Sequence, residues 1–234
     1  QVCAAAAPGC ESHRALARRA VAASCVVLQN RDGLLPLQTD APLVVAGRGA
    51  HDLGMQCGGW SMEWAGFRGN DATIGTTIWE AVRALNPRAQ LLCERAARAP
   101  PSPARAGAVA LVVVGEQPYV EAGGDVIDLT LDKSDCSVIE AMETAGYSVV
   151  AVLLSGRPLA LPESTLAAAS SLVAAWLPGT EAAGVVDVLV GSAAWSGRLS
   201  FAWPRRGCDG DIRSRAGRAC LFGVGHGLAL SHET

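Results

Sequence analysis

Several kinds of sequence signal are scarce or missing in this chain. No apolar run approaches the roughly 20 residues that a helix needs to cross a bilayer, so no membrane span is predicted. No Asn-x-Ser/Thr sequon occurs, so N-glycosylation is not predicted. The net charge of −3 is small and gives no reason to expect nucleic acid as a partner. Of the 19 Lys and Arg residues only Lys133 is lysine, which we interpret as coding bias.

Signals for a cofactor or a metal ion are also missing. No Gly-x-Gly-x-x-Gly or P-loop pattern follows a strand-like run, which argues against nucleotide binding. The cysteines form no Cys-x-x-Cys pair, and the histidines lack the spacing of metal ligands. Ser155 stands outside any Gly-x-Ser-x-Gly elbow, so serine hydrolysis is not expected. We therefore predict neither a cofactor nor a metal.

The hydrophobic half of the sequence predicts the fold. Apolar runs without alternation indicate buried strands at 43–47, 108–114, 147–154 and 171–176, with weaker strand signals at 90–93 and 196–204. Helical patterns fall between them, at 11–28, 76–85, 134–145, 162–169 and 182–190. Continuous apolar strands separated by helices indicate a parallel sheet covered on both faces. We predict an irregular tail over 1–11 and one α/β domain over 12–234, a three-layer α/β/α sandwich with a mostly parallel sheet, flavodoxin-like in general shape.

Residues 115–125, here called the acid loop, are the first candidate for a functional site. They follow the most hydrophobic strand-like run and combine glycines and a proline with the carboxylates of Glu116, Glu121 and Asp125. Ligands of open α/β sheets bind beyond the carboxyl ends of the strands, which is where this loop is expected. We predict that Glu121 donates a proton. Glu116 and Asp125 are expected to shape the loop, because carboxylates in glycine-rich loops commonly accept backbone N–H bonds.

A second long loop, over 48–75 and here called the Trp loop, contains Trp60 and Trp64. A loop of this length in a compact domain is usually functional. The two glycines before Trp60 favour its exposure, whereas Trp64 is expected to pack within the loop. Trp79 and Trp176 lie in helix and strand patterns and are expected in the core.

The eight cysteines leave two interpretations open. Cys3 with Cys10, and Cys208 with Cys220, bracket short loops and are plausible disulfides in an oxidising compartment. A secreted protein, or one in another oxidising compartment, follows from that interpretation. Alternatively, most of the cysteines are small buried hydrophobic residues.

Five short motifs occur in the order seen in one known family. They are Gly-Met-Gln-Cys-Gly-Gly-Trp-Ser at 54–61, Gly-Thr-Thr-Ile at 75–78, Val-Val-Gly-Glu-Gln-Pro-Tyr-Val-Glu-Ala-Gly-Gly-Asp at 113–125, Ser-Gly-Arg-Pro at 155–158 and Ala-Ala-Trp-Leu-Pro-Gly-Thr-Glu at 174–181. With them, the chain from about His13 to the Gly-His-Gly-Leu at 225–228 resembles the C-terminal α/β-sandwich domain of glycoside hydrolase family 3, in its β-glucosidase and exo-β-glucanase branch.

The resemblance implies a retaining β-glycosidase site shared between two domains, acting on a β-linked glucoside or oligosaccharide. The family's N-terminal barrel domain carries the nucleophilic aspartate. The C-terminal domain lends the acid/base glutamate, which matches Glu121, and a tryptophan against the +1 sugar, which matches Trp60. A retaining mechanism needs two carboxyl groups about 5–5.5 Å apart, and sugar rings stack on aromatic faces. Arg157 could line the cleft, although a structural salt bridge is the favoured interpretation.

The sequence departs from the family in one important respect. The barrel domain and its Ser-Asp-Trp-type nucleophile segment do not appear, and Gln29 stands where the family usually has lysine. Three explanations remain open: a precursor cut in two with the barrel in a separate bound chain, which the start at Gln1 favours; a fragment; or a non-catalytic binding or structural subunit. In the first two, this chain alone is not expected to be active.

Overall fold

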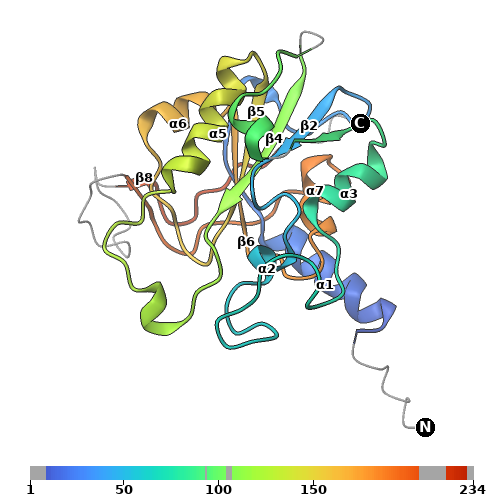
Figure 1. Ribbon diagram of the computed structural model, residues 1–234, viewed down its shortest axis with the longest axis vertical. Helices are drawn as coiled ribbons and strands as arrows, with labels where there is room; N and C mark the ends of the chain where they lie inside the picture. Colours follow the sequence, from blue (N-terminus) through green and yellow to red (C-terminus); the bar gives the residue numbers. More distant parts are fainter. Residues whose placement is uncertain (1–8, 93, 104–106, 206–219, 231–234) are drawn as a thin grey trace.

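A six-stranded sheet forms the centre of the computed structural model, which describes residues 9–92, 94–103, 107–205 and 220–230 (Figure 1). The order of the strands is β1-β6-β5-β4-β2-β3. Their bounds are β1 (Val26–Asn30), β2 (Leu43–Ala46), β3 (Gln90–Leu91), β4 (Val109–Gly115), β5 (Ser148–Leu154) and β6 (Ser171–Trp176). Only the β1–β6 pair is antiparallel within this sheet. The mostly parallel α/β sheet predicted from the sequence is therefore confirmed.

Helices cover both faces of the sheet (Figure 1). Their bounds are α1 (Glu11–Ser24), α2 (Leu53–Cys57), α3 (Ile78–Leu85), α4 (Glu94–Arg98), α5 (Lys133–Thr144), α6 (Glu163–Ala168) and α7 (Ala183–Leu189). One core joins α1, α3 and α7 to the sheet, and a second joins α4, α5 and α6 to its other face. Alternate residues of β4 enter the two cores: Leu111 and Val113 the first, Val112 and Val114 the second. This two-sided burial explains why the strand is apolar without alternation.

The chain differs from the predicted elements in two places. The helix expected over 11–28 ends at Ser24, and Val26–Asn30 forms β1 instead. Val26 and Val27 are β-branched and fully buried where β1 pairs with β6, so packing against the sheet overrides the helical pattern. Within the long loop expected over 48–75, the chain also forms the short helix α2. The weak strand signal over 196–204 becomes β7 (Trp203–Pro204), which pairs with β8 (Cys220–Phe222).

Thr77 starts α3 as the sequence predicts. Its hydroxyl accepts a hydrogen bond from the N–H of Glu80, and the Glu80 carboxylate accepts one from the N–H of Thr77. This capping box satisfies two N–H groups that would otherwise be unpaired at the helix start. The cap also fixes where the Trp loop ends.

The carboxyl ends of the central parallel strands lie at one edge of the sheet, and Gly115 is the residue that lets β4 reach it. Gly115 pairs with Leu154 of β5 and has a φ of 151°, which residues with a side chain rarely adopt. A Cβ atom at this position would lie 1.8 Å from the carbonyl oxygen of Leu154. Only glycine therefore keeps the two strands in register up to the start of the acid loop.

The described part of the chain leaves the predicted disulfides unsupported. Cys10 and Cys220 are free thiols, and their expected partners Cys3 and Cys208 lie outside the described residues. Cys25 and Cys136 are buried, and burial raises the pKa of the Cys25 thiol to about 12. For these two, the interpretation as small buried hydrophobic residues is confirmed. Among the described helices, none is both long and apolar enough to cross a membrane.

Truncation of a core leucine tests this arrangement. Leu153 of β5 is 1% exposed, so Leu153→Ala should lower the free energy of unfolding by about 3 kcal/mol through lost burial and a residual cavity. Leu16→Ala is the matched control, because Leu16 is 56% exposed on α1 and should cost less than about 0.5 kcal/mol. Urea denaturation monitored by circular dichroism measures both. Equal effects of the two changes would contradict the placement of β5 in the centre of the sheet.

Candidate functional site

The acid loop and the Trp loop project from the same end of the molecule, beyond the carboxyl ends of β4 and β2 (Figure 1). Glycine brings them together. A Cβ atom on Gly59 would lie 2.1 Å from the carbonyl oxygen of Tyr119, so the two backbones touch at a point where no larger residue fits. The sequence prediction that both loops belong to one site is therefore consistent with their positions.

Glu116 is the centre of a polar network at the start of the acid loop. Its Oε1 accepts hydrogen bonds from Arg157 Nη2 at 2.6 Å and Nε at 2.9 Å. Its Oε2 accepts from the hydroxyls of Ser155 at 2.6 Å and Tyr119 at 3.2 Å. Both carboxylate oxygens are thus engaged, and a two-pronged guanidinium bond is among the strongest side-chain contacts. Glu116 is held by side chains, whereas the sequence suggested that it would accept backbone N–H bonds.

Arg157 extends this network to the far side of the acid loop. Its Nη1 donates to the carbonyl oxygen of Gly124, and its guanidinium lies 4.5 Å from the centre of the Tyr119 ring. Burial and then the neighbouring Glu116 carboxylate raise the pKa of the Tyr119 hydroxyl, which keeps it a hydrogen-bond donor. The favoured interpretation of Arg157, a structural salt bridge, agrees with these contacts, and the same side chain also lines a hollow beside the loop.

Glu121 lies at the tip of this braced loop. It begins a short 3-10 turn, Glu121–Gly124, with a φ of 46°. Its carboxylate is exposed and forms no hydrogen bond or ion pair within the described part of the chain. Asp125, four residues on, is exposed in the same way. A group that is fixed at its backbone and open at its side chain is available to a ligand or a partner.

Trp60 is also presented to the exterior. It is 66% exposed, with a φ of 60°, and its N–H donates to the carbonyl oxygen of Trp64 at 3.1 Å. The exposure expected for Trp60 is confirmed. Trp64 meets Trp60 edge to face at 6.3 Å, but it remains 58% exposed, so the expectation that it packs within the loop is only partly met. Trp79 and Trp176 are half-buried and lie at the rim of the core.

Two hollows flank the acid loop. The first, of about 390 Å³, is polar and lies beside Arg48, Glu116, Asp132 and Arg157. The second, of about 230 Å³, lies between the acid loop and the Trp loop, and Gln117 lines both. The Oε1 atom of Gln117 is buried with no hydrogen-bond partner among the described residues. These hollows provide the polar, concave surface that a small hydrophilic ligand requires.

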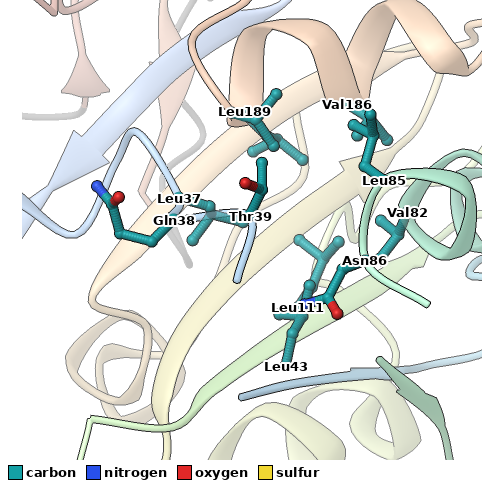
Figure 2. Close-up of a pocket in the computed structure, with 11 residues that line it drawn as sticks. Leu37, Gln38, Thr39, Leu43, Val82, Leu85, Asn86, Leu111, Val186 and Leu189 are labelled. Carbon is teal, nitrogen blue, oxygen red and sulfur yellow. The ribbon is translucent and has the colours of Figure 1, made fainter. Parts of the chain in front are cut away.

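A third hollow lies away from this edge, beside the amino end of β2 (Figure 2). Leucines and valines line most of it, including Leu43, Leu111 and Leu189, and no charged side chain faces it. Its volume of about 20 Å³ is room for a single water molecule. This hollow is too small and too apolar to be the site of hydrolytic chemistry.

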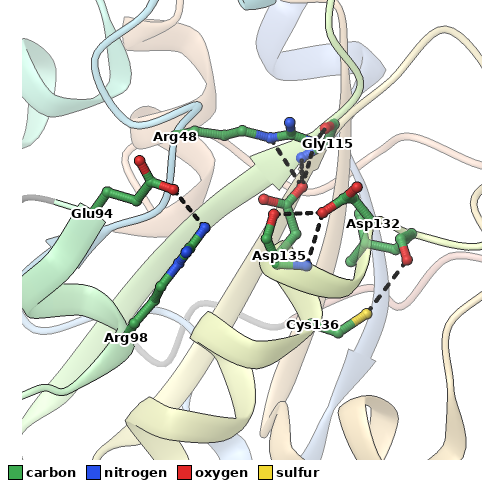
Figure 3. Close-up of polar contacts among 9 residues, drawn as sticks. Arg48, Glu94, Arg98, Gly115, Asp132, Asp135 and Cys136 are labelled. Atoms are coloured by element: carbon green, nitrogen blue, oxygen red, sulfur yellow. Dashed lines mark hydrogen bonds and ion pairs between the residues drawn. The ribbon is translucent and has the colours of Figure 1, made fainter.

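Sequence reasoning missed two residues near the acid loop, Arg48 and Asp135. They form an ion pair of 2.8 Å that also contacts Gly115 (Figure 3). Asp135 lies in the first turn of α5 and Arg48 in the loop after β2. A buried acid at a helix start, opposite an arginine 87 residues earlier, leaves no local motif in the sequence. Among the described residues, no group of three His, Cys, Asp or Glu side chains is placed to hold a metal ion.

The comparison with known families agrees with the site. Residues 25–230 match the model of the glycosyl hydrolase family 3 C-terminal domain. The chain therefore belongs to glycoside hydrolase family 3, as a C-terminal domain of that family.

Relatives of known name share the same region. The chain is 28% identical over 211 residues to the lysosomal beta glucosidase of Dictyostelium discoideum, covering 81% of this chain and 25% of that protein. It is 28% identical over 226 residues to the periplasmic beta-glucosidase of Salmonella typhimurium, covering 82% and 29%. The crystal structure of the exo-1,3/1,4-beta-glucanase of a Pseudoalteromonas species superposes with a TM-score of 0.82 at 33% identity, covering 94% of this chain and 29% of that one. The chain thus spans between a quarter and a third of the length of these relatives.

The network around Glu116 can be tested without any ligand. Glu116→Gln removes the charge that Arg157 pairs with while keeping the shape, and it should lower the free energy of unfolding by about 1–2 kcal/mol. The comparable change in the exposed Glu94–Arg98 pair, Glu94→Gln, should cost less than about 0.5 kcal/mol. Thermal unfolding followed by calorimetry compares the two. Equal midpoints for Glu116→Gln and the parent protein would contradict the network.

Proposed function

We propose that this chain supplies the acid/base half of a retaining β-glucosidase or exo-glucanase site. Membership of family 3 supports the proposal, and so do the names of its relatives. The single observation that carries it is the presentation of Glu121: an exposed, unpaired carboxylate on a loop braced by Glu116 and Arg157, next to the exposed ring of Trp60. The domain proposed for this role spans 12–234.

Glu121 acts in both halves of the reaction. It first protonates the glycosidic oxygen as the bond to the leaving group breaks, while a nucleophilic aspartate attacks the sugar from the opposite face. It then removes a proton from the water that hydrolyses the glycosyl-enzyme intermediate. The chain has no nucleophile segment of its own, so a barrel domain in a bound chain or a larger assembly supplies the aspartate. The two carboxyl groups lie about 5–5.5 Å apart in the complete site.

The remaining side chains have supporting roles in this proposal. Trp60 stacks against the sugar in the +1 subsite, since an exposed indole ring offers the flat apolar surface that sugar C–H groups prefer. Glu116 and Arg157 hold the acid loop and thereby the direction of Glu121. Asp125 contributes to the loop as an exposed polar residue. Since relatives are periplasmic and lysosomal, a secreted or otherwise non-cytosolic location is proposed for this chain as well.

A second function is favoured by one observation, the missing nucleophile segment. A family 3 domain without a barrel partner would be a non-catalytic binding or structural subunit. Gln29, which replaces the usual lysine, fits either function, because its amide group donates to the backbone carbonyls of Leu166 and Ala169 and thereby ties β1 to α6. The partner of the acid loop and the Trp loop distinguishes the two functions: a barrel indicates an enzyme, and an unrelated protein indicates a structural subunit.

Neutralising Glu121 tests the catalytic role. In the complex with the barrel-bearing partner, Glu121→Gln should lower kcat/KM for a β-glucoside with a poor leaving group by at least about 100-fold, because proton transfer is lost. Azide should partly restore turnover of aryl glucosides whose leaving groups need no protonation. Glu143→Gln is the control, since Glu143 is an exposed acid on α5. Unchanged steady-state rates for Glu121→Gln would remove the acid/base assignment.

Truncating Trp60 tests the sugar-binding role. Trp60→Ala should lower kcat/KM about tenfold for a β-linked disaccharide, which places a second sugar on the ring, and much less for a methyl β-glucoside. Trp60→Phe keeps an aromatic face and should retain most of the disaccharide activity. Initial rates with both substrates measure the difference. Equal losses on the two substrates would place Trp60 outside the +1 subsite.

A further inference from the structure

Three residues from separate parts of the chain meet where β4 becomes the acid loop. Arg48 follows β2, Asp135 lies in the first turn of α5, and Gly115 ends β4 (Figure 3). The Oδ2 atom of Asp135 accepts from Arg48 Nη2 at 2.8 Å, from Arg48 Nε at 3.2 Å and from the N–H of Gly115 at 3.2 Å. Arg48 Nη2 also donates to the carbonyl oxygen of Gly115 at 2.7 Å. We call this set the Gly115 clamp.

The clamp holds both backbone polar groups of the residue from which the loop departs. Its N–H is bound by Asp135 and its C=O by Arg48, so neither rotation of the peptide nor a shift along the strand leaves both bonds intact. The next residue, Glu116, is held by Arg157, and the same arginine holds Gly124 at the far end of the loop. The tip that carries Glu121 therefore lies between two independently fixed ends.

The two charged members of the clamp differ in their contact with solvent. The side chain of Asp135 is 4% exposed and that of Arg48 is 33% exposed. Burial raises the pKa of Asp135 to about 6, against the opposing influence of Arg48. A carboxylate held where its charge is costly is poor evidence for a gain in stability. Its contacts with the Gly115 backbone suggest another reason for its presence.

We propose that Arg48 and Asp135 are positioning residues, which fix the direction in which the acid loop leaves the sheet and hence the direction of Glu121. The effect on loop order stands on the contacts of the clamp. The effect on turnover rests in addition on the proposed function of Glu121. Because the clamp depends on the charge of Asp135, loop order falls as the medium becomes mildly acidic.

The surroundings of Asp135 identify Arg48 as the cation that balances it. Asp132, at the N-cap of the same helix, adds negative charge, and its carboxylate is bound to Ser134. Glu94 and Arg98 of α4, which packs on α5, pair with each other. Glu140 of α5 binds the hydroxyl of Thr165 on α6. Protonation of Asp135 therefore removes the partner of Arg48, and no other carboxylate described near the clamp is bound to that arginine.

The sign of the pH effect separates loop order from stability. The folded-state pKa of Asp135 is raised above its ordinary value of 3.8, so the folded state binds a proton more readily than the unfolded chain does. Acidification from pH 7 toward pH 5 therefore costs no folding stability through this group. It weakens the contact with Arg48, and the expected result is a looser acid loop in a protein that is equally or more stable.

Amide hydrogen exchange of the full chain tests the clamp. Asp135→Asn keeps the shape and an acceptor oxygen but removes the charge, and Arg48→Gln acts on the more exposed partner. At pH 7.5 each should speed exchange of the peptide covering 115–125 by about tenfold, as expected for the loss of a charge-assisted hydrogen bond. The β5 peptide should not change. Glu94→Gln, in the exposed pair on α4, is the matched control and should leave the acid loop unchanged.

The pH profile supplies a readout that a structural role alone would not move. The ratio of acid-loop protection between the parent protein and Asp135→Asn should shrink as pH falls from 7.5 to 5, because the parent's own carboxylate becomes neutral in that window. A ratio that stays constant across this range, loop exchange equal to that of the parent in both clamp variants, or exchange raised equally throughout the sheet would each overturn the proposal.

An activity measurement in the same variants separates the clamp from the proposed function. In the complex with the barrel-bearing partner, both clamp variants should lower kcat with little change in KM. Faster loop exchange combined with an inactive parent complex supports the clamp and contradicts the proposed enzyme. A fall in kcat with unchanged loop exchange supports the enzyme and overturns the clamp.

Discussion

The close approach of β4 and β5 at Gly115 is the constraint on which the rest of the site depends. Because the pair Gly115–Leu154 leaves no room for a side chain, the parallel register runs to the end of both strands and the loops after them start from a fixed line. Ser155 follows β5 directly, and Arg157 two residues later, so the register itself places both opposite Glu116. The polar network is thus a consequence of strand pairing, and the acid loop inherits its position from the sheet.

This arrangement separates two tasks within one short segment. The residues at the base of the acid loop, Gly115 and Glu116, have all of their described polar side-chain and carbonyl contacts satisfied internally. The residue at the tip, Glu121, makes no such contact. Preorganised catalytic groups need a rigid support and an open reactive end. The nearby Trp60, also exposed and held only through its backbone to Trp64, follows the same division. Both features describe half of a site that a second surface completes.

The sequence predicted the sheet and both loops because their causes are local. Continuous burial on two faces makes β4, β5 and β6 apolar throughout, and glycines mark the places where backbones touch. It could not predict that Val26–Asn30 is a strand, because only pairing with β6 decides that. Nor could it find the Arg48–Asp135 pair, whose members are 87 residues apart and belong to no motif. Motif resemblance identified Glu121 and Trp60, whereas long-range packing determines what holds them.

The central claim is that Glu121 is one carboxyl group of a catalytic pair whose other member lies on a barrel domain. A crystal structure of this chain with its natural neighbouring domain or chain, bound to a non-hydrolysable β-glucoside analogue, tests it most directly. We expect an aspartate of the barrel about 5–5.5 Å from the Glu121 carboxyl group, on the opposite side of the sugar. A neighbour without such an aspartate, or a Glu121 that faces solvent while the analogue is bound elsewhere, would contradict the account.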